Sequence, residues 1–219
     1  MTIRATFQAD LNELKEMILK LGSQAQDAVG QAIEALKNQD VDKALKIIEN
    51  DTHLNILEEE INDKATLLIA QQAPVAIDLR RVIVAIKISS DLERVGDLAV
   101  NIAKSVIRIG TQQLIKPIED IPRIAEVAKK MVADSLRAYS EEDVELAKNV
   151  AKVDDEVDEA YGRLIKELLE LMTQKPEYIS QITQLSFICR NIERVADHST
   201  NISESILYLI KGKRYDLNE

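Results

Sequence analysis

The chain is poor in the residues that sheets, tight turns and disulfide frameworks require. Its 219 residues include six glycines, four prolines and no tryptophan, and aromatic residues make up 3%. Because strands and tight turns favour aromatic residues and glycine, this scarcity argues against a β-rich fold and for long helices. The single cysteine, Cys189, excludes an internal disulfide and fits a packed thiol in a reducing compartment.

The sequence also lacks a membrane span and a cluster of positive charge. No apolar run approaches the roughly 18 residues of a transmembrane helix, and the first residues are amphipathic rather than signal-like. We therefore expect a cytoplasmic protein that associates with a membrane only through its partners. The formal net charge of −10 disfavours nucleic acid as a partner. An acidic surface instead suits metal cations or a basic patch on another protein.

What the sequence does contain is long helical periodicity punctuated by proline. All four prolines fall between periodic segments, where proline begins a helix rather than continuing one: Pro74, Pro117, Pro122 and Pro176. Apolar residues recur at heptad-like intervals, which favours antiparallel packing with small crossing angles. The pattern predicts six helices, over residues 2–37, 41–72, 74–110, 121–139, 142–173 and 177–211.

Two twelve-residue segments, 100 positions apart, are nearly the same. DLERVGDLAVNI runs from Asp91 to Ile102 and NIERVADHSTNI from Asn191 to Ile202, and six positions are identical. Residues 50–55 also correspond to residues 153–158, with an offset of 103. We therefore predict an all-α fold, a tandem pair of antiparallel three-helix bundles related by an internal pseudo-two-fold repeat. We place the first repeat at residues 1–112 and the second at 113–219.

Both copies carry oxygen-bearing side chains four residues apart. The last helices contribute Glu93, Asp97 and Asn101 in the first half, and Glu193, Asp197 and Asn201 in the second. The middle helices contribute Asp51 with Asn55, and Asp154 with Asp158. Residues at this spacing share one helix face. On a helical wheel the last-helix acids face away from the core and the middle-helix pairs lie at its flank, so we expect one outer groove per half.

Such a groove has the chemistry of a metal site. Carboxylate and amide oxygens without histidine or thiolate favour hard cations such as Mg²⁺, Ca²⁺, Mn²⁺ or iron. Like charges four residues apart repel by roughly 0.2–0.5 kcal/mol per pair, and a bound cation would relieve that repulsion. The alternative is an ordinary acidic surface, in which Arg94 pairs with its neighbours.

Other polar residues give weaker signals. His198 lies off the face shared by Glu193 and Asp197, so we expect a simple surface histidine. Basic residues recur at intervals of seven and are expected to form a solvated face: Arg80, Lys87 and Arg94. No nucleotide-binding loop, nucleophile elbow, HExxH or CxxC motif is present, and neither repeated segment contains the ExxH of di-iron bundles. We therefore predict that the protein is not an enzyme, with a carboxylate-bridged metalloenzyme as the weakest alternative.

Three segments resemble the signatures of the PhoU family of phosphate-signalling regulators. They are PVAIDLRR at residues 74–81, DLERVGD at 91–97, and ERVADHSTNI at 193–202, and the resemblance covers essentially the whole chain. It implies an all-α, non-enzymatic adaptor of the Pst phosphate ABC transporter. It also implies negative regulation of the phosphate regulon, by relaying transporter status to a sensor histidine kinase. We further expect a homodimer.

The resemblance also implies multinuclear metal clusters on the bundle surface. Carried onto this chain, the ligands are Glu93, Asp97 and Asp51 in the first half and Glu193, Asp197, Asp154 and Asp158 in the second, with Asn55, Asn101 and Asn201 as weaker candidates. Iron, zinc, manganese and magnesium are the candidate metals. Since Asn55 stands where the other half has Asp158, we expect the first groove to carry one fewer charge and to bind metal more weakly. An acidic interaction scaffold without physiological metal remains the alternative.

Overall fold

The computed structural model describes residues 3–217, in which long helices are joined by short connections and no strand occurs. The elements are α1 (Ile3–Asn38), α2 (Val41–Gln72), α3 (Ala76–Ile109), α4 (Asp120–Glu141), α5 (Val144–Gln174), the 3₁₀ turn η1 (Pro176–Tyr178) and α6 (Ile179–Lys211). The predicted all-α fold with six long helices is confirmed. Among the described residues, no helix is both long enough and apolar enough to cross a membrane.

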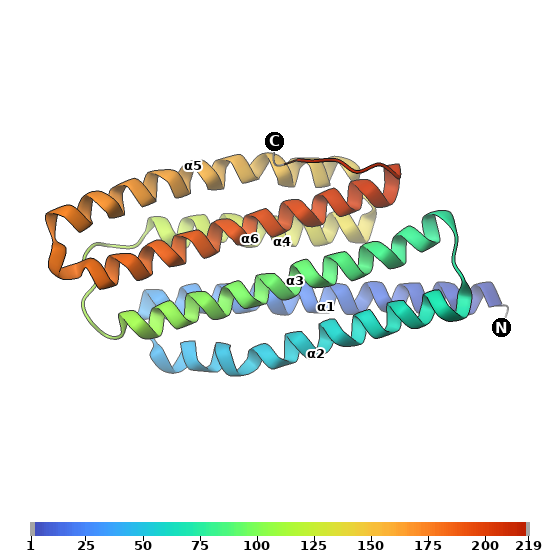
Figure 1. Cartoon of the computed structure of the whole chain (residues 1–219), viewed down its shortest axis with the longest axis horizontal. Coiled ribbons are helices and arrows are strands. Elements are labelled where there is room, and N and C mark those ends of the chain that lie inside the picture. The colour runs from blue at the N-terminus through green and yellow to red at the C-terminus, as the bar shows by residue number, and fades with distance from the viewer. Residues whose placement is uncertain (1–2, 218–219) are drawn as a thin grey trace.

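The two three-helix halves lie side by side and share one core (Figure 1). Within each half all three helices contact one another, and the halves meet where α3 packs on α6 and α1 on α4. In the described residues α2 and α5 contact only their own half and lie at opposite edges of the molecule (Figure 1). Buried apolar side chains form one cluster that runs through both halves. The division of the chain at residues 112 and 113 falls in the α3–α4 connection and stays a prediction.

Local capping explains where the helices differ from the predicted ranges. Asp40 and Asp143 accept hydrogen bonds from backbone N–H groups in the first turns of α2 and α5. Glu142, predicted to start the fifth helix, instead has a φ of 53° and follows the last residue of α4. The third helix begins at Ala76 rather than at Pro74, because Ala73 adopts a left-handed conformation that closes α2.

Gly22 on α1 tests how closely this helix packs on α4, and Gly162, at an open position on α5, is its control. A Cβ on Gly22 would overlap the side chain of Leu136, whereas a Cβ on Gly162 would meet no heavy atom within 4 Å. We expect Gly22→Ala to lower the free energy of unfolding by about 1–2 kcal/mol, because the strain of displacing Leu136 exceeds the gain in helix propensity. Gly162→Ala gains helix propensity without any strain, so it should raise the free energy of unfolding by about 0.5–1 kcal/mol. Urea denaturation measures both, and changes of the same sign would contradict this packing.

Candidate metal centres

The second half brings acidic side chains from two helices together. One carboxylate oxygen from each of Asp154 and Asp158, on α5, and Asp197, on α6, lies within 4.8 Å of the others. Asp154 is 7% exposed, Asp197 is partly buried and Asp158 is exposed, so the cluster extends from the packed contact of α5 with α6 to the surface. These residues with Glu193 are called the second groove. In the part of the chain that the structure describes, no other group of three or more His, Cys, Asp or Glu residues is close enough to share one ion.

Burial and mutual repulsion disfavour ionisation in this groove. Burial, and then the nearby Asp197 and Asp158, raise the pKa of Glu193 to about 7. Burial also raises the pKa of Asp154 to about 6, although a hydrogen bond from Thr200 opposes that shift. The pKa of Asp197 is raised by burial first and by Asp158 second. Arg190 offsets part of the shift at Glu193, and His198 and Arg194 offset part of the shift at Asp197. A metal ion would add further positive charge and would lower these pKa values.

Asp154 provides a direct test of whether the groove suits a cation. Its Oδ2 accepts a hydrogen bond from Oγ1 of Thr200 at 3.0 Å. Its Oδ1 is buried and has no hydrogen-bond partner. Leaving a buried polar oxygen unsatisfied costs about 1–3 kcal/mol, and more for a charged group. The donor set, all carboxylate oxygen with one oxygen unpaired, therefore fits a hard metal ion.

The first half repeats this groove between α2 and α3. Burial, and then Asp97, raise the pKa of Asp51. Burial and Asp97 also raise the pKa of Glu93, with smaller contributions from Glu58 and Asp51. Arg94 counteracts part of this repulsion, since its Nη1 lies 2.8 Å from Asp97 Oδ2 and its Nε 3.4 Å from Glu93 Oε2. Arg94 thus neutralises part of the first groove, and its counterpart Arg194 acts in the same direction on Asp197 in the second.

Glu58 and Tyr161 belong to the grooves but are missing from the sequence prediction. They occupy corresponding positions, 103 residues apart. Glu58 lies one helical turn after Asn55, and Tyr161 lies one turn after Asp158. Burial, and then Glu193, raise the pKa of Tyr161. The first groove therefore loses one acid at Asn55 but gains another at Glu58. Glu58 thus offsets the missing charge at Asn55, since each groove then has four of the named carboxylates: Asp51, Glu58, Glu93 and Asp97, or Asp154, Asp158, Glu193 and Asp197. The expected weaker binding of metal by the first groove stays a prediction.

The helical wheel predicted that the acids of α3 and α6 face away from the core. In the structure they are only partly exposed to solvent. The side chains of Glu93 and Asp97 are 19% and 37% exposed. The wheel describes one helix at a time, so it does not show that α2 packs alongside and covers part of the stripe. Asn101 is exposed and Asn201 partly buried. The role of these residues as metal ligands stays a prediction.

Two residues expected on a solvated surface instead join the halves. His198 Nδ1 lies 2.9 Å from Oδ1 of Asp91 on α3, and the two side chains are only 15% and 19% exposed. Arg80 donates its Nε–H to the carbonyl of Leu209 near the end of α6, at 3.0 Å. The expectation of a simple surface histidine is wrong, because local spacing does not reveal that α3 and α6 pack together. Cys189 is buried, as predicted.

The fold and its duplicated grooves define the protein as an all-α bundle built from two tandem repeats. The family model described as the PhoU domain matches residues 18–106 and 121–206, one stretch in each repeat. The chain belongs to the PhoU family.

Relatives in several bacteria match nearly the full length of the chain. The phosphate-specific transport system accessory protein PhoU homolog of Clostridium acetobutylicum is 41% identical over 217 residues, which are 99% of each chain. The homolog of Rhizobium meliloti is 37% identical over 96% of this chain and 89% of its own.

Two solved structures share the fold. The crystal structure of the phosphate transport system regulatory protein PhoU from Streptococcus pneumoniae matches with a TM-score of 0.90 and 33% identity, covering 96% of this chain and 99% of that one. PhoU from Pseudomonas aeruginosa matches with a TM-score of 0.91 and 31% identity, covering 94% of this chain and all of that one.

Proposed function

We propose that this protein is a non-enzymatic regulatory accessory of phosphate uptake that binds metal ions in its two acidic grooves. The relatives are named as accessory proteins of a phosphate-specific transport system, and one of the structures as a regulatory protein of phosphate transport. Identity of 41% along nearly the whole chain supports the same role here. In that role the protein couples the Pst transporter to a sensor histidine kinase and represses the phosphate regulon when phosphate is plentiful.

The observation that supports the metal most directly is the partly buried carboxylate cluster of the second groove. Asp154 and Asp158 from α5 and Asp197 from α6 would hold the ion, with Glu193 beside them. An oxygen-ligated ion there would neutralise the repulsion and link the two helices, which is a structural role. Iron, manganese, magnesium and zinc are candidates. In the first groove a metal would have to draw Asp51, Glu58, Glu93 and Asp97 closer together than they lie here, and it would compete with Arg94.

An acidic interaction scaffold without metal is the second candidate. The observation that favours it is Arg94, which already pairs with both Asp97 and Glu93 in the first groove. Elemental analysis of untagged protein purified without chelators separates the two candidates. A carboxylate-bridged oxidase gains no support. Among the described residues, the one cluster of at least three side chains close enough to share an ion consists of aspartates and includes no histidine. The homodimer rests on the family resemblance and stays a prediction.

The regulatory role is tested in the organism itself. Deleting the gene should switch on a phosphate-starvation promoter in phosphate-rich medium, because the repressing adaptor is gone. The intact chain, returned at its native level, should silence the promoter again. Capture of the returned protein should recover a Pst component and a histidine kinase. A promoter that stays silent after deletion, or failure to recover either partner at high and low phosphate, would contradict the proposal.

A further inference from the structure

Helix α2 carries large apolar side chains on the face that points away from the core. Leu45, Ile56 and Leu67 are 45%, 48% and 54% exposed. Because 11 residues make three turns with only about 20° left over, the three side chains form one line about 33 Å long. At 100° per residue this line lies opposite the buried stripe that includes Leu54 and Ile61. We call these three residues the outer line of α2.

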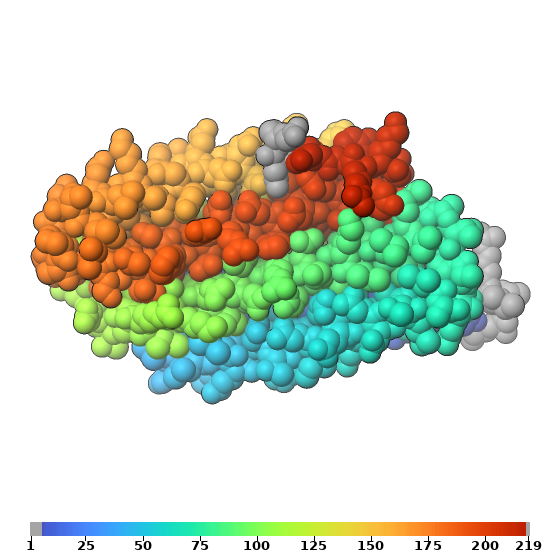
Figure 2. Space-filling view, viewed as in Figure 1, coloured from blue at the N-terminus to red at the C-terminus, as the bar shows by residue number. Residues whose placement is uncertain are grey.

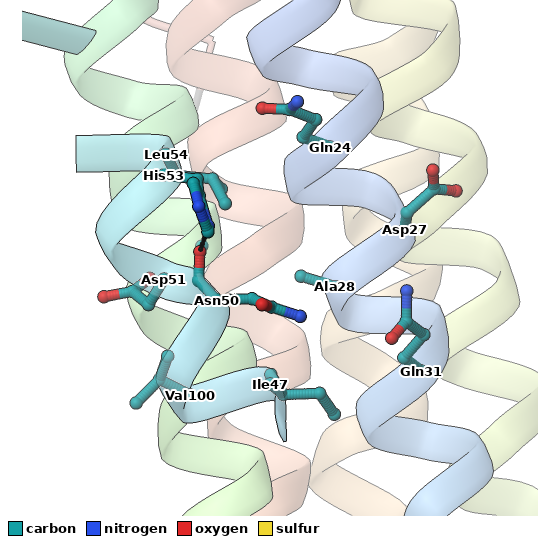
Figure 3. A pocket seen from close by; sticks show the side chains of 11 residues that line it. Gln24, Asp27, Ala28, Gln31, Ile47, Asn50, Asp51, His53, Leu54 and Val100 are labelled. Atoms are coloured by element: carbon teal, nitrogen blue, oxygen red, sulfur yellow. Dashed lines mark hydrogen bonds between the residues drawn. The ribbon is translucent and has the colours of Figure 1, made fainter. Parts of the chain in front are cut away.

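The fold itself makes no use of the outer line. Among the described residues α2 contacts only α1 and α3, and it lies at one edge of the molecule (Figure 1). The side chains of Ile47 and Asn50 extend from α2 toward α1, on a different side of the helix (Figure 3). The solvent-facing side of such an edge helix is normally polar. The core of this chain therefore does not account for three apolar residues there.

The other half shows how the same positions look when they face only water. Helix α5 lies at the opposite edge and likewise contacts only its own half in the described residues. Its residues at the three corresponding positions, with the offset of 103, are all charged: Lys148, Glu159 and Glu170. The outer line is therefore not a by-product of the repeated fold, and it distinguishes α2 from its own counterpart.

The surroundings of the outer line are acidic. Exposed acids lie on the line or within about 60° of it: Glu49, Glu59, Glu60 and Asp63. Lys43 and Lys64 turn instead toward α1, where they pair with acids of that helix. Two copies of this face would bring like charges together, and nucleic acid or anionic lipid would be repelled. A partner that covers the line must therefore supply positive charge.

We propose that the outer face of α2 docks an amphipathic helix of a partner protein, in which lysine or arginine flanks an apolar stripe. The stripe would contact the outer line, and the basic residues would face the acids beside it. Recognition of this kind depends on apolar anchors at helical spacing. Contact of one helix with one helix is small, so we expect a weak, reversible complex. Asp51 and Glu58 of the first groove lie on another side of α2, so docking does not depend on metal.

Docking is tested with fluorescent helical peptides of about 22 residues, the length of the outer line, titrated into the full chain. One peptide has a leucine stripe flanked by lysines, the second has the same composition in scrambled order, and the third has glutamates in place of the lysines. We expect saturable one-to-one binding of the first, weakening with salt, and at least about tenfold weaker binding of the others. Equal binding of the first and the scrambled peptide, or no saturable binding, would overturn the proposal.

Substitutions copied from α5 locate the docking surface. Ile56→Glu combined with Leu67→Glu should weaken binding of the basic amphipathic peptide by at least about tenfold, without changing metal content. Mere attraction of a basic peptide to an acidic protein predicts the opposite, because the double variant is more acidic. Leu169→Glu is the matched control, since Leu169 is 53% exposed on α5, and should leave the affinity unchanged. Unchanged or tighter binding by the double variant would refute this placement.

The occupant in the cell is identified by photo-crosslinking from the outer line. The full chain carries p-benzoylphenylalanine in place of Ile56, or of Leu169 as the control. We expect position 56 to crosslink to a segment of another protein in which lysines or arginines flank apolar residues at helical spacing. A crosslink to a second copy of this chain, a segment without that pattern, or no product beyond the control would each contradict the proposal. Neither experiment depends on the promoter or on metal, so its failure is distinct from failure of the proposed function.

Discussion

Replacing Asp158 and Asp197 together by asparagine is expected to remove metal from the second groove. Two of the three carboxylates that lie within 4.8 Å of one another then lose their charge, while the shape of the groove is kept. Inductively coupled plasma analysis should find fewer metal ions per chain than in the unaltered protein. Glu156→Gln is the control, since Glu156 is exposed on the same helix and lies outside the cluster. Equal metal content in the double variant and the unaltered protein would disprove the assignment.

The thermal stability of the same double variant should show whether Asp158 and Asp197 bind metal or only affect folding. A metal at 100 times its dissociation constant stabilises a protein by about 2.7 kcal/mol, which corresponds to a rise of about 5–10 °C in Tm for a chain of this size. The unaltered protein and the Glu156→Gln control should lose this increment when a chelator is added, and the double variant should respond less, because only its first groove can still hold metal. Without metal, the double variant should be at least as stable as the unaltered protein, because fewer like charges meet in the groove.

The metal-free protein is expected to lose stability as the pH rises from about 5 to about 8. In the native state Glu193 has a pKa of about 7 and Asp154 of about 6, above their ordinary values of 4.5 and 3.8. The native state therefore holds more protons than the unfolded chain between these values, and the free energy of unfolding falls as they are released. Their contribution is fully present below the ordinary values and is lost as the pH passes through 6 and 7.

The expected loss is about 1–3 kcal/mol in total, reduced from the full effect of the pKa shifts because Glu193 remains partly in contact with solvent. Denaturant unfolding at a series of pH values, in the presence of a chelator, measures it. Glu193→Gln combined with Asp154→Asn should flatten the profile, and Glu156→Gln should not. With metal bound the trend should weaken or reverse, because metal and protons compete for the same oxygens. A steady rise in stability over this range in chelator would contradict the shifts.

The fold was largely predictable because its signals are local. Helical periodicity, four prolines and the 100-residue repeat determine the number, order and approximate ends of the helices. The repeat also indicated that Asp154, Asp158 and Asp197 belong to one groove, since each has a counterpart in the first half. These inferences require only spacing along the chain.

Contacts between the halves could not be predicted in this way. The pairing of His198 with Asp91 depends on α3 packing against α6, which no local pattern specifies. Glu58 was missed because its counterpart is not an acid but Tyr161, so a search for repeated carboxylates passes over it.

The core that runs through both halves bears on how such a chain arose. In Figure 2, α2, α3, α6 and α5 follow one another across one face, and α3 and α6 adjoin along its middle. A solitary three-helix unit would expose to water the apolar sides of its first and last helices, which here are buried against the other half. An ancestor with one repeat would thus have needed a second copy of itself to fold. Joining two copies in one chain makes that association intramolecular and independent of protein concentration. It also leaves each copy free to diverge, as the exchange between Glu58 in the first half and Tyr161 in the second illustrates.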